Sequence, residues 1–315
     1  MKGSGRQVKR VLVLVMSALL VVVGQIIPVN SPEYPLRVAV GLWPGSESLL
    51  EAQERGLLPE SDFVFLEATW PSAAYRAFDN EAVDAAVLST EDVDRLRASG
   101  EDVRIICFMD ESEGADALIS VDGVRSIREL AGKRIGVASH GPGHHFLEDA
   151  LASGGLKGDD VEIVTLLEPD IPDSLGSGLV SAVVAAEPWI EGILSGGGRI
   201  LMDSGRVKAS YYRLLVAREA ALREKRTAFV QLLRAHFATA PLLGALGEGG
   251  SKGKIPKRQR VSPESFTDIM SRIRIFTPEE NLKLMESDGI SVVGSDESGM
   301  LKKWADDRVV REVMR

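Results

Sequence analysis

Apolar and polar positions alternate in a regular way between residues 36 and 201 of this 315-residue chain. Short apolar runs rich in β-branched residues, which are typical of buried strands, are separated by stretches whose apolar residues recur at helical spacing. Repeated strand–helix units of this kind predict an α/β fold with mainly parallel sheets flanked by helices. The expected strands are residues 36–41, 62–67, 83–88, 103–108, 134–138, 161–166 and 179–186.

The same pattern occurs twice in the chain. Residues 37–45 (RVAVGLWPG) resemble residues 134–143 (RIGVASHGPG), and in each copy a Pro-Gly turn leads from an apolar strand into a stretch of helical period. Residues 81–90 resemble residues 178–187 at nearly the same offset from the first element. Self-similarity of this kind indicates repeated structural units, so we expect two similar α/β halves.

Beyond residue 211 the spacing of apolar residues becomes helical. Residues 244–260 are an exception, because they are rich in Gly, Lys and Arg and contain few apolar residues. That composition is typical of a solvated surface segment, and we expect a mobile loop there. The amphipathic stretches should pack against the two halves as a helical C-terminal part. They are residues 218–240, 262–273, 278–287 and 297–314.

The N-terminus has the layout of an export signal. Four cations and no acid precede residues 11–29, which carry no charge. Such a run suits a signal peptide within residues 1–29 and is also close to the ~20 residues that span a bilayer, so cleavage and retention as a membrane anchor both remain open. A buried N-terminal helix is the alternative that the basic flank disfavours. Because the cations should stay in the cytoplasm, we expect the rest of the chain to be periplasmic or otherwise extracytoplasmic.

Charge and cysteine content exclude several classes of protein. Four of the 37 Lys and Arg precede the apolar run, and the remaining 33 face 46 Asp and Glu, which is a net charge of −13. An acidic surface repels phosphate backbones, so nucleic acid is not an expected partner. Cys107 is the only cysteine, which excludes an internal disulfide and leaves no cysteine after the apolar run for a lipid anchor. We expect Cys107 to be a buried core thiol.

Polar and aromatic residues follow the predicted strands at the points where the strands end. In open α/β sheets, ligands bind beyond the carboxyl ends of the strands, where helix N-termini present backbone N–H groups. Rings, hydroxyls and N–H groups at such positions suit a small polar guest. The candidates are Trp43, Ser72, Ser89, Thr90, His140, Gly141, Glu187 and Trp189. The hydroxyl residues among them are also ordinary helix N-caps, and that alternative stays open.

Patterns of catalysis and metal binding are scarce. The chain contains no H-E-x-x-H, P-loop or G-x-G-x-x-G motif. The nearest approach to a metal site is the pair His144 and Glu148, four residues apart and so on one helix face, with His140 and His145 nearby. Because exposed histidine pairs at a helix start are common, we assign no metal, no cofactor and no catalytic residue.

Five short segments, taken in order, resemble the nitrate, sulfonate, taurine and thiamine-precursor group of ABC-transporter substrate-binding proteins, a group also described as NMT1-like. The segments are VAVGLWPG at 38–45, VDAAV at 83–87, EGADALI at 113–119, LAGKRIGV at 130–137 and EPW at 187–189. The resemblance covers about residues 36–216. It implies a type II periplasmic-binding-protein fold, in which two α/β lobes close over a ligand.

The resemblance also implies how the chain divides between the lobes and which residues meet the ligand. The eight candidates above would line the cleft, and Asp116 would join them at the hinge. The implied segments are 36–118 for the first part of lobe 1, 119–204 for lobe 2, 205–315 for the return to lobe 1 and the C-terminal helices, and 117–122 and 204–217 for the two crossings.

The function that follows is the capture of a small polar solute and its delivery to an ABC permease in the membrane, by a protein that we expect to be monomeric. Asp116 and Glu187 near the cleft disfavour a bare anion, because unpaired carboxylates repel anions, and they favour a cationic or zwitterionic ligand. Two alternatives remain open. One is a membrane-tethered sensory or partner-binding module, and the other is an enzyme on the same fold, related to the thiamine-pyrimidine synthase or to the dehydratases of menaquinone synthesis.

Overall fold

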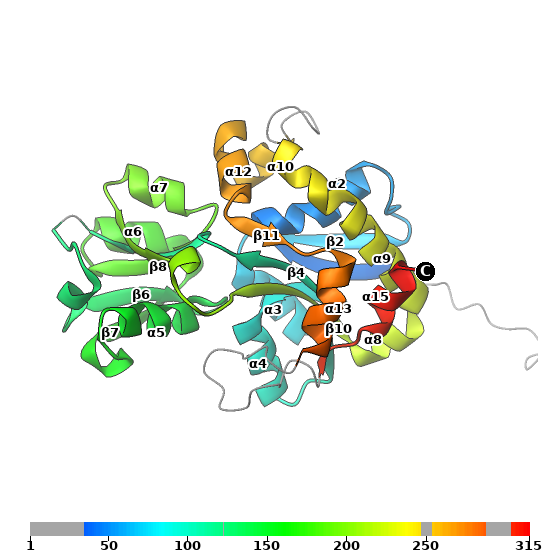
Figure 1. The fold of residues 1–315 in the computed structure, drawn as a ribbon, viewed down its shortest axis with the longest axis horizontal. Coiled ribbons are helices and arrows are strands. Elements are labelled where there is room, and N and C mark those ends of the chain that lie inside the picture. The colour runs from blue at the N-terminus through cyan, green and yellow to red at the C-terminus, as the bar shows by residue number, and fades with distance from the viewer. Residues whose placement is uncertain (1–34, 122, 247–253, 288–303) are drawn as a thin grey trace, which may run out of the picture. The chain divides into compact units, whose positions relative to one another are not determined.

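The computed structural model describes residues 35–121, 123–246, 254–287 and 304–315. Leu36–Arg315 form one compact unit (Figure 1). The expected signal peptide or anchor at residues 1–29 lies outside the described residues. Within the described ranges, no helix is long and apolar enough to cross a membrane.

The first sheet, which defines lobe 1, has six strands in the order β11-β4-β10-β3-β1-β2. β1 pairs in parallel with β2 and β3, whereas β10 runs antiparallel to both β3 and β4. β11 adds a short antiparallel edge beside β4. The strands are β1 (Leu36–Gly41), β2 (Phe63–Ala68), β3 (Ala85–Ser89), β4 (Val103–Ser112), β10 (Tyr212–Arg218) and β11 (Ile273–Ile275).

The second sheet, which defines lobe 2, has five strands in the order β7-β6-β8-β5-β9. β6 pairs in parallel with β7 and β8, and β5 runs antiparallel to β8 and β9. The strands are β5 (Asp116–Ser120), β6 (Arg134–Ala138), β7 (Glu162–Leu166), β8 (Ala182–Ala186) and β9 (Arg199–Asp203).

The two sheets share one topology, which confirms the prediction of two similar halves. Without β11, the lobe 1 order β2-β1-β3-β10-β4 matches the lobe 2 order β7-β6-β8-β5-β9, and the repeated sequence segments lie on β1 and β6 and on β3 and β8. Both sheets are mixed: the strands of the strand–helix units pair in parallel, as expected, and β5, β10 and β11 run in the opposite direction. β5 and β10 directly follow the two connections between the lobes.

The lobes are joined at residues 113–115, between β4 and β5, and at residues 204–211, between β9 and β10. The first connection was expected at 117–122, with the lobe boundary after residue 118. The structure differs because Asp116–Ser120 are fully buried and pair with both β8 and β9, so they belong to the second sheet.

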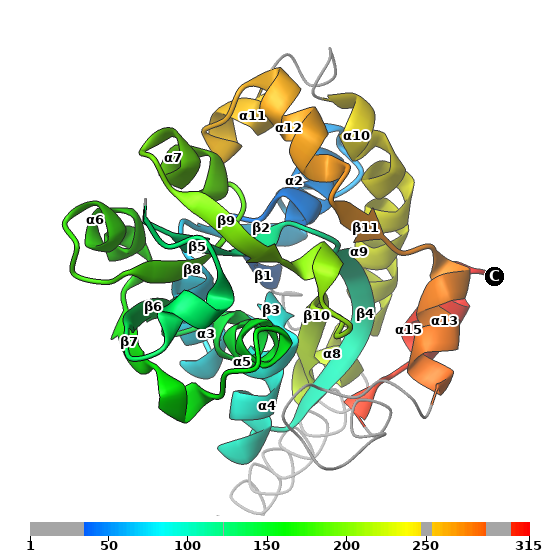
Figure 2. The same ribbon diagram turned by 60° about the vertical axis from the view of Figure 1, so that its left-hand side comes forward.

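Helices cover the faces of both sheets (Figures 1 and 2). Lobe 1 carries α2 (Glu47–Glu54), α3 (Pro71–Asp79) and α4 (Thr90–Ala98), and lobe 2 carries α5 (Gly143–Ser153), α6 (Ile171–Gly176) and α7 (Ile190–Ser195). The C-terminal part contributes α8 (Glu219–Glu224), α9 (Arg226–Thr239), α10 (Leu243–Leu246), α11 (Lys254–Gln259), α12 (Pro263–Met270), α13 (Pro278–Glu286) and α15 (Arg308–Val313). Of these, α9 packs against α2, and α15 packs against α9. Short 3-10 turns lie at η1 (Pro44–Ser46), η2 (Ile127–Leu130), η3 (Gly158–Asp160), η4 (Glu168–Asp170), η5 (Ser204–Arg206) and η6 (Ala240–Leu242).

Part of the loop expected at residues 244–260 is helical. Residues 247–253 lie outside the described residues, but 254–259 form α11. Arg258 of α11 pairs with Glu47, at 2.5 Å, and with Glu54, both on α2. The Gln259 side chain donates a hydrogen bond to Glu47, at 2.6 Å. The prediction was wrong here because basic and amide side chains of this segment neutralise a buried carboxylate instead of facing solvent.

Each lobe has its own apolar core. The lobe 1 core contains residues of β1, β3, β4 and β10 together with α9 and α15. Apolar clusters cover both faces of the second sheet in lobe 2. Cys107 of β4 is fully buried in the lobe 1 core, as expected, and burial raises the pKa of its thiol. It is therefore a packing residue and no nucleophile.

Candidate functional site

A cavity of about 90 Å³ lies between the two lobes, at the carboxyl ends of their parallel strands. Its walls include the ends of β1 and β3 in lobe 1 and of β6 and β8 in lobe 2. Much of the wall is apolar, including Leu42, Val87, Ile171, Pro172 and Val184. In such a site a few polar groups decide which molecule binds and in which orientation.

Tight turns at the strand ends present helix N-termini to this cavity. Trp43 and Pro44 lead from β1 into η1 and α2, and Ser89 caps α4 by accepting a hydrogen bond from the Asp92 backbone N–H, at 3.1 Å. In lobe 2, Gly141 turns the chain between β6 and α5 with a φ of +88°, a conformation that favours glycine. The repeated strand–turn–helix sequences therefore place their turns on opposite walls of one cavity.

A buried aromatic and ionic cluster, most of it in lobe 1, forms part of the cavity wall. The Trp43 Nε1–H donates to both carboxylate oxygens of Asp110, at 3.0 and 3.1 Å, and the guanidinium of Arg213 lies over the Trp43 ring, 4.0 Å from its centroid. Arg213 also donates through Nη2 to Asp116, at 3.1 Å. A Cβ at Gly45 would lie 2.2 Å from Asp110 Oδ2, so only glycine fits beside this carboxylate. Burial raises the pKa of Asp110 to about 7 despite the neighbouring Arg213.

A second buried carboxylate, Glu187, lies at the end of β8. Its Oε1 accepts a hydrogen bond from Arg272, at 2.8 Å, and its backbone N–H donates to Ala115 beside the hinge, at 2.9 Å. The peptide bond between Glu187 and Pro188 is cis. Burial raises the pKa of Glu187, and Arg272 opposes that rise. We call Trp43, Ser46, Asp110, Asp116, Glu187 and Arg213 the cleft interior.

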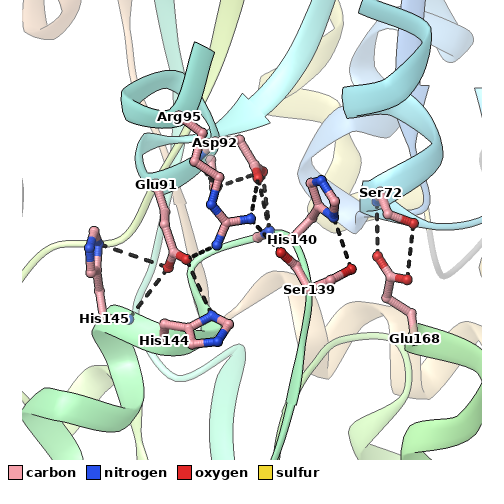
Figure 3. Close-up of polar contacts among 11 residues, drawn as sticks. Ser72, Glu91, Asp92, Arg95, Ser139, His140, His144, His145 and Glu168 are labelled. Carbon is pink, nitrogen blue, oxygen red and sulfur yellow. Dashed lines mark hydrogen bonds and ion pairs between the residues drawn. The ribbon is translucent and has the colours of Figure 1, made fainter. Parts of the chain in front are cut away.

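Polar side chains at the entrance of the cavity bind the two lobes to each other. Asp92 of α4 accepts hydrogen bonds from the Gly141 N–H of lobe 2, at 3.2 Å to each oxygen, and from the Ser89 hydroxyl, at 2.7 Å. Arg95 of α4 donates to the Ser139 carbonyl oxygen across the same gap (Figure 3). Glu91, also of α4, lies 3.3 Å from His144 Nδ1. Burial opposes ionisation of Glu91, but its pKa is lowered because His144, His145 and Arg95 surround it.

The other side of the entrance is closed by a carboxylate and by stacked rings. Glu168 of η4 in lobe 2 accepts from the backbone N–H and the hydroxyl of Ser72 in lobe 1, at 2.9 and 3.0 Å (Figure 3). Trp70 of lobe 1 stacks on Trp189 of lobe 2, with ring centroids 4.6 Å apart. We call these contacts between α3 or α4 and lobe 2 the cleft margin. They join the two lobes beside the cavity.

His140 lies beside the margin in a tilted ring contact with Tyr75, at 4.5 Å between centroids. Burial lowers the pKa of His140, and the nearby Asp92 only partly offsets this effect. Its Nδ1 lies 2.9 Å from the Ser139 hydroxyl. A neutral imidazole at this position can exchange a hydrogen bond with a guest but adds no charge to the site near neutral pH.

The structure brings most of the predicted site residues together. Seven of them line the cavity, namely Trp43, Ser89, Asp116, His140, Gly141, Glu187 and Trp189. Ser72 lies at the margin, bonded to Glu168, and Thr90 is the buried first residue of α4. Neither of these two is part of the cavity wall.

Sequence reasoning missed four polar residues of the wall: Ser46, Asp92, Glu168 and Arg213. Glu168 follows the predicted strand at 161–166 and so satisfies the rule that located the others. Arg213 is a lone cation inside the apolar run from Tyr211 to Ala217, which is a signal of a buried partner. Ser46 and Asp92 each lie in the first helical turn after a predicted strand. At that position the sequence alone does not distinguish a residue that faces a cleft from an ordinary helix cap.

No group of three or more His, Cys, Asp or Glu side chains in the described part of the chain is arranged to hold a metal ion. His144 and His145 instead both face Glu91 across the cleft.

Comparisons with known proteins support this architecture, although the chain has no match among curated proteins. The fold is similar to that of the periplasmic aliphatic sulphonate-binding protein SsuA from Escherichia coli (20% identity, TM-score 0.65, 87% of this chain and 98% of that chain covered). It is also similar to the periplasmic nitrate-binding protein NrtA from Synechocystis PCC 6803 (13% identity, TM-score 0.67, 90% and 89% covered). A DszB variant in complex with biphenyl-2-sulfinic acid matches as well (17% identity, TM-score 0.61, 89% and 98% covered).

These likenesses establish a periplasmic-binding-protein-like α/β fold with two mixed sheets. The profile of the NMT1-like family matches residues 30–244, which is more than half of the sequence, and the chain therefore belongs to the NMT1-like family.

Proposed function

We propose that this protein is an extracytoplasmic solute-binding component of an ABC importer, which captures a small polar molecule between its lobes and delivers it to a membrane permease. The observation that carries the proposal is the cavity enclosed by the strand ends of both lobes, with buried charged groups in its wall. SsuA and NrtA, which share the fold, are described as sulphonate-binding and nitrate-binding proteins.

The mechanism is closure about the two connections between the sheets. Asp116 and Arg213 form an ion pair at this hinge, because Asp116 begins β5 just after the first connection and Arg213 lies in β10 just after the second. A ligand that contacts both walls binds the closed form more tightly than the open form and so shifts the population toward closure. The permease would recognise the closed pair of lobes. Export through residues 1–29, by cleavage or as an anchor, would place the protein on the same side of the membrane as its solute.

The direct test is thermal unfolding of the full chain in the presence of single solutes: amino acids, polyamines, sulfonates, nitrate, bicarbonate and pyrimidines. A solute present at ~100 times its Kd should stabilise the protein by about 2.7 kcal/mol. The bound solute should be recovered chemically unchanged, as judged by mass spectrometry. Conversion of the solute would instead identify an enzyme on this fold. Failure of every solute to stabilise the chain would favour a partner-binding module.

A further inference from the structure

The cleft interior contains polar atoms that the protein itself does not satisfy. Arg213 Nη1, Glu187 Oε2 and Ser46 Oγ are buried and, among the described residues, have no hydrogen-bond partner. All three residues line the cavity, and they are only 7%, 2% and 1% exposed, respectively. Buried polar atoms without a partner cost free energy, so these three are open positions for a ligand.

The two charged groups are each half-satisfied in a fixed orientation. Arg213 is held by its contact with the Trp43 ring and by its Nη2 bond to Asp116, which leaves Nη1 as a free donor. Glu187 is held by the Arg272 bond to Oε1, which leaves Oε2 as a free acceptor. Ala186, the residue before Glu187, pairs in register with Asp116, so both open positions flank the same carboxylate at the hinge.

The charges around these positions balance, which restricts the net charge of the guest. Arg213 is paired with Asp116, and Glu187 is paired with Arg272. These positions therefore hold no unpaired protein charge that a guest of a single sign could neutralise. Asp92 and Glu168 add further carboxylates to the cavity wall. A bare oxyanion would face this excess of carboxylates, whereas a guest that carries both signs can satisfy a donor and an acceptor together.

We propose, on the basis of the solute-binding function above, that the cavity takes a small amino-carboxylate zwitterion with an apolar substituent. Its carboxylate accepts a hydrogen bond from Arg213 Nη1, and its ammonium group donates to Glu187 Oε2. The Ser46 hydroxyl is the third polar contact. The apolar substituent lies against Leu42, Val87, Val184 and Ile171, which line the same cavity.

The test compares five probes on the full chain by isothermal titration calorimetry and thermal unfolding. L-Valine carries both charges, isobutylamine only the cation and isovalerate only the anion, on the same branched carbon skeleton. Isovaleramide keeps a donor and an acceptor without charge, and methanesulfonate represents a bare oxyanion. Valine should bind best, with each of the other four at least about tenfold weaker, because each loses at least one charge-assisted hydrogen bond.

Two variants assign the ends of the ligand. Glu187→Gln keeps a carbonyl oxygen for Arg272 but turns an amide NH2 group toward the ligand. The variant should bind valine at least about tenfold more weakly, with no loss of affinity for isovalerate. Glu224→Gln, the same change at an exposed position of α8, should leave both affinities unchanged. Arg213→Lys keeps a cation beside Asp116 and should lower the affinities for valine and isovalerate by similar factors.

The outcomes separate the ligand class from the solute-binding function. Isobutylamine, isovalerate, isovaleramide or methanesulfonate binding as tightly as valine would overturn the zwitterion assignment and leave solute capture standing. Absence of valine binding would also overturn the assignment, and the broader solute screen would then decide whether any solute is captured. Equal loss of valine affinity in Glu187→Gln and Glu224→Gln would show that Glu187 makes no specific contact.

Discussion

The margin of the cleft and its interior use similar side chains in opposite ways. At the margin, carboxylates of one lobe are paired with donors of the other, as Asp92 is with Gly141 and Glu168 with Ser72. In the interior, Arg213 and Glu187 are each paired on one side only, and their other polar atoms face the cavity. The margin can therefore stabilise a closed form without a ligand. In the interior, by contrast, only a ligand can satisfy the free donor and the free acceptor. Under the proposed function, ligand selection would depend mainly on Arg213 and Glu187 and lobe closure mainly on the margin, with Asp92 and Glu168 lining the cavity as well.

Replacement of Trp43 should have the largest effect on stability. Trp43→Ala removes a ring that is 6% exposed, supports Arg213 and donates to Asp110. Loss of a buried tryptophan costs about 3–5 kcal/mol, which urea unfolding will measure. Trp70→Ala at the margin removes only a partly exposed stacking partner of Trp189, so it should cost much less. Equal costs for the two variants would contradict the distinction between interior and margin.

The buried Asp110 should make stability depend on pH. Its folded pKa of about 7 lies above its ordinary value, so the folded state keeps the proton that the unfolded chain releases. Stability should therefore be greatest below the unfolded pKa, decline as pH rises through the window up to about 7, and then level off. Each pKa unit corresponds to about 1.4 kcal/mol, so the whole decline is on the order of a few kcal/mol.

Asp110→Asn imitates the neutral carboxyl and tests this assignment. The variant should flatten the decline and unfold at higher urea concentration than the unsubstituted protein at pH 8. Asp159→Asn, at an exposed position of η3, should leave the profile unchanged. Parallel pH profiles for Asp110→Asn and the unsubstituted protein would show that Asp110 is ionised in the folded state throughout.

At the margin, removal of Glu168 should weaken closure rather than folding. Glu168→Ala eliminates both bonds to Ser72, and hydrogen bonds to a charged acceptor contribute roughly 1.5–3 kcal/mol each. Faster dissociation of a bound solute is expected, because the closed form loses support. Ser72→Ala removes only the hydroxyl bond and leaves the backbone N–H bond, so its effect should be intermediate. Stopped-flow experiments measure the dissociation rate for both variants. An unchanged rate in Glu168→Ala would show that this contact does not stabilise the closed form.

The repeated strand–turn–helix pattern predicted most of the fold and the region of the site, because apolar periodicity and Pro-Gly turns are local signals. β1 and β6 agree with the prediction at both ends, since each is bounded by its own turn. β5, β9 and β10 were missed because their positions depend on pairing with strands distant in sequence. The same reason hid Arg213, whose role depends on Trp43 and Asp116. Local patterns locate the strand ends, but not which charged groups meet there.

The smallest effect is expected at the histidine cluster of the margin. Glu91 has a lowered pKa beside His144 and His145, so its contribution to the closed form is present above the unfolded pKa and is lost as pH falls through the folded pKa. His144→Gln removes one of the partners that lower the pKa of this carboxylate and should move that loss to higher pH. A single partly exposed ion pair contributes about 1 kcal/mol or less, so the change in the pH at which this contribution is lost will be modest. Because Glu91, His144 and His145 are not among the described residues that line the cavity, solute selectivity should not change. The measurement is the solute dissociation rate from pH 3.5 to 7, and altered selectivity in His144→Gln would show that margin and interior are not independent.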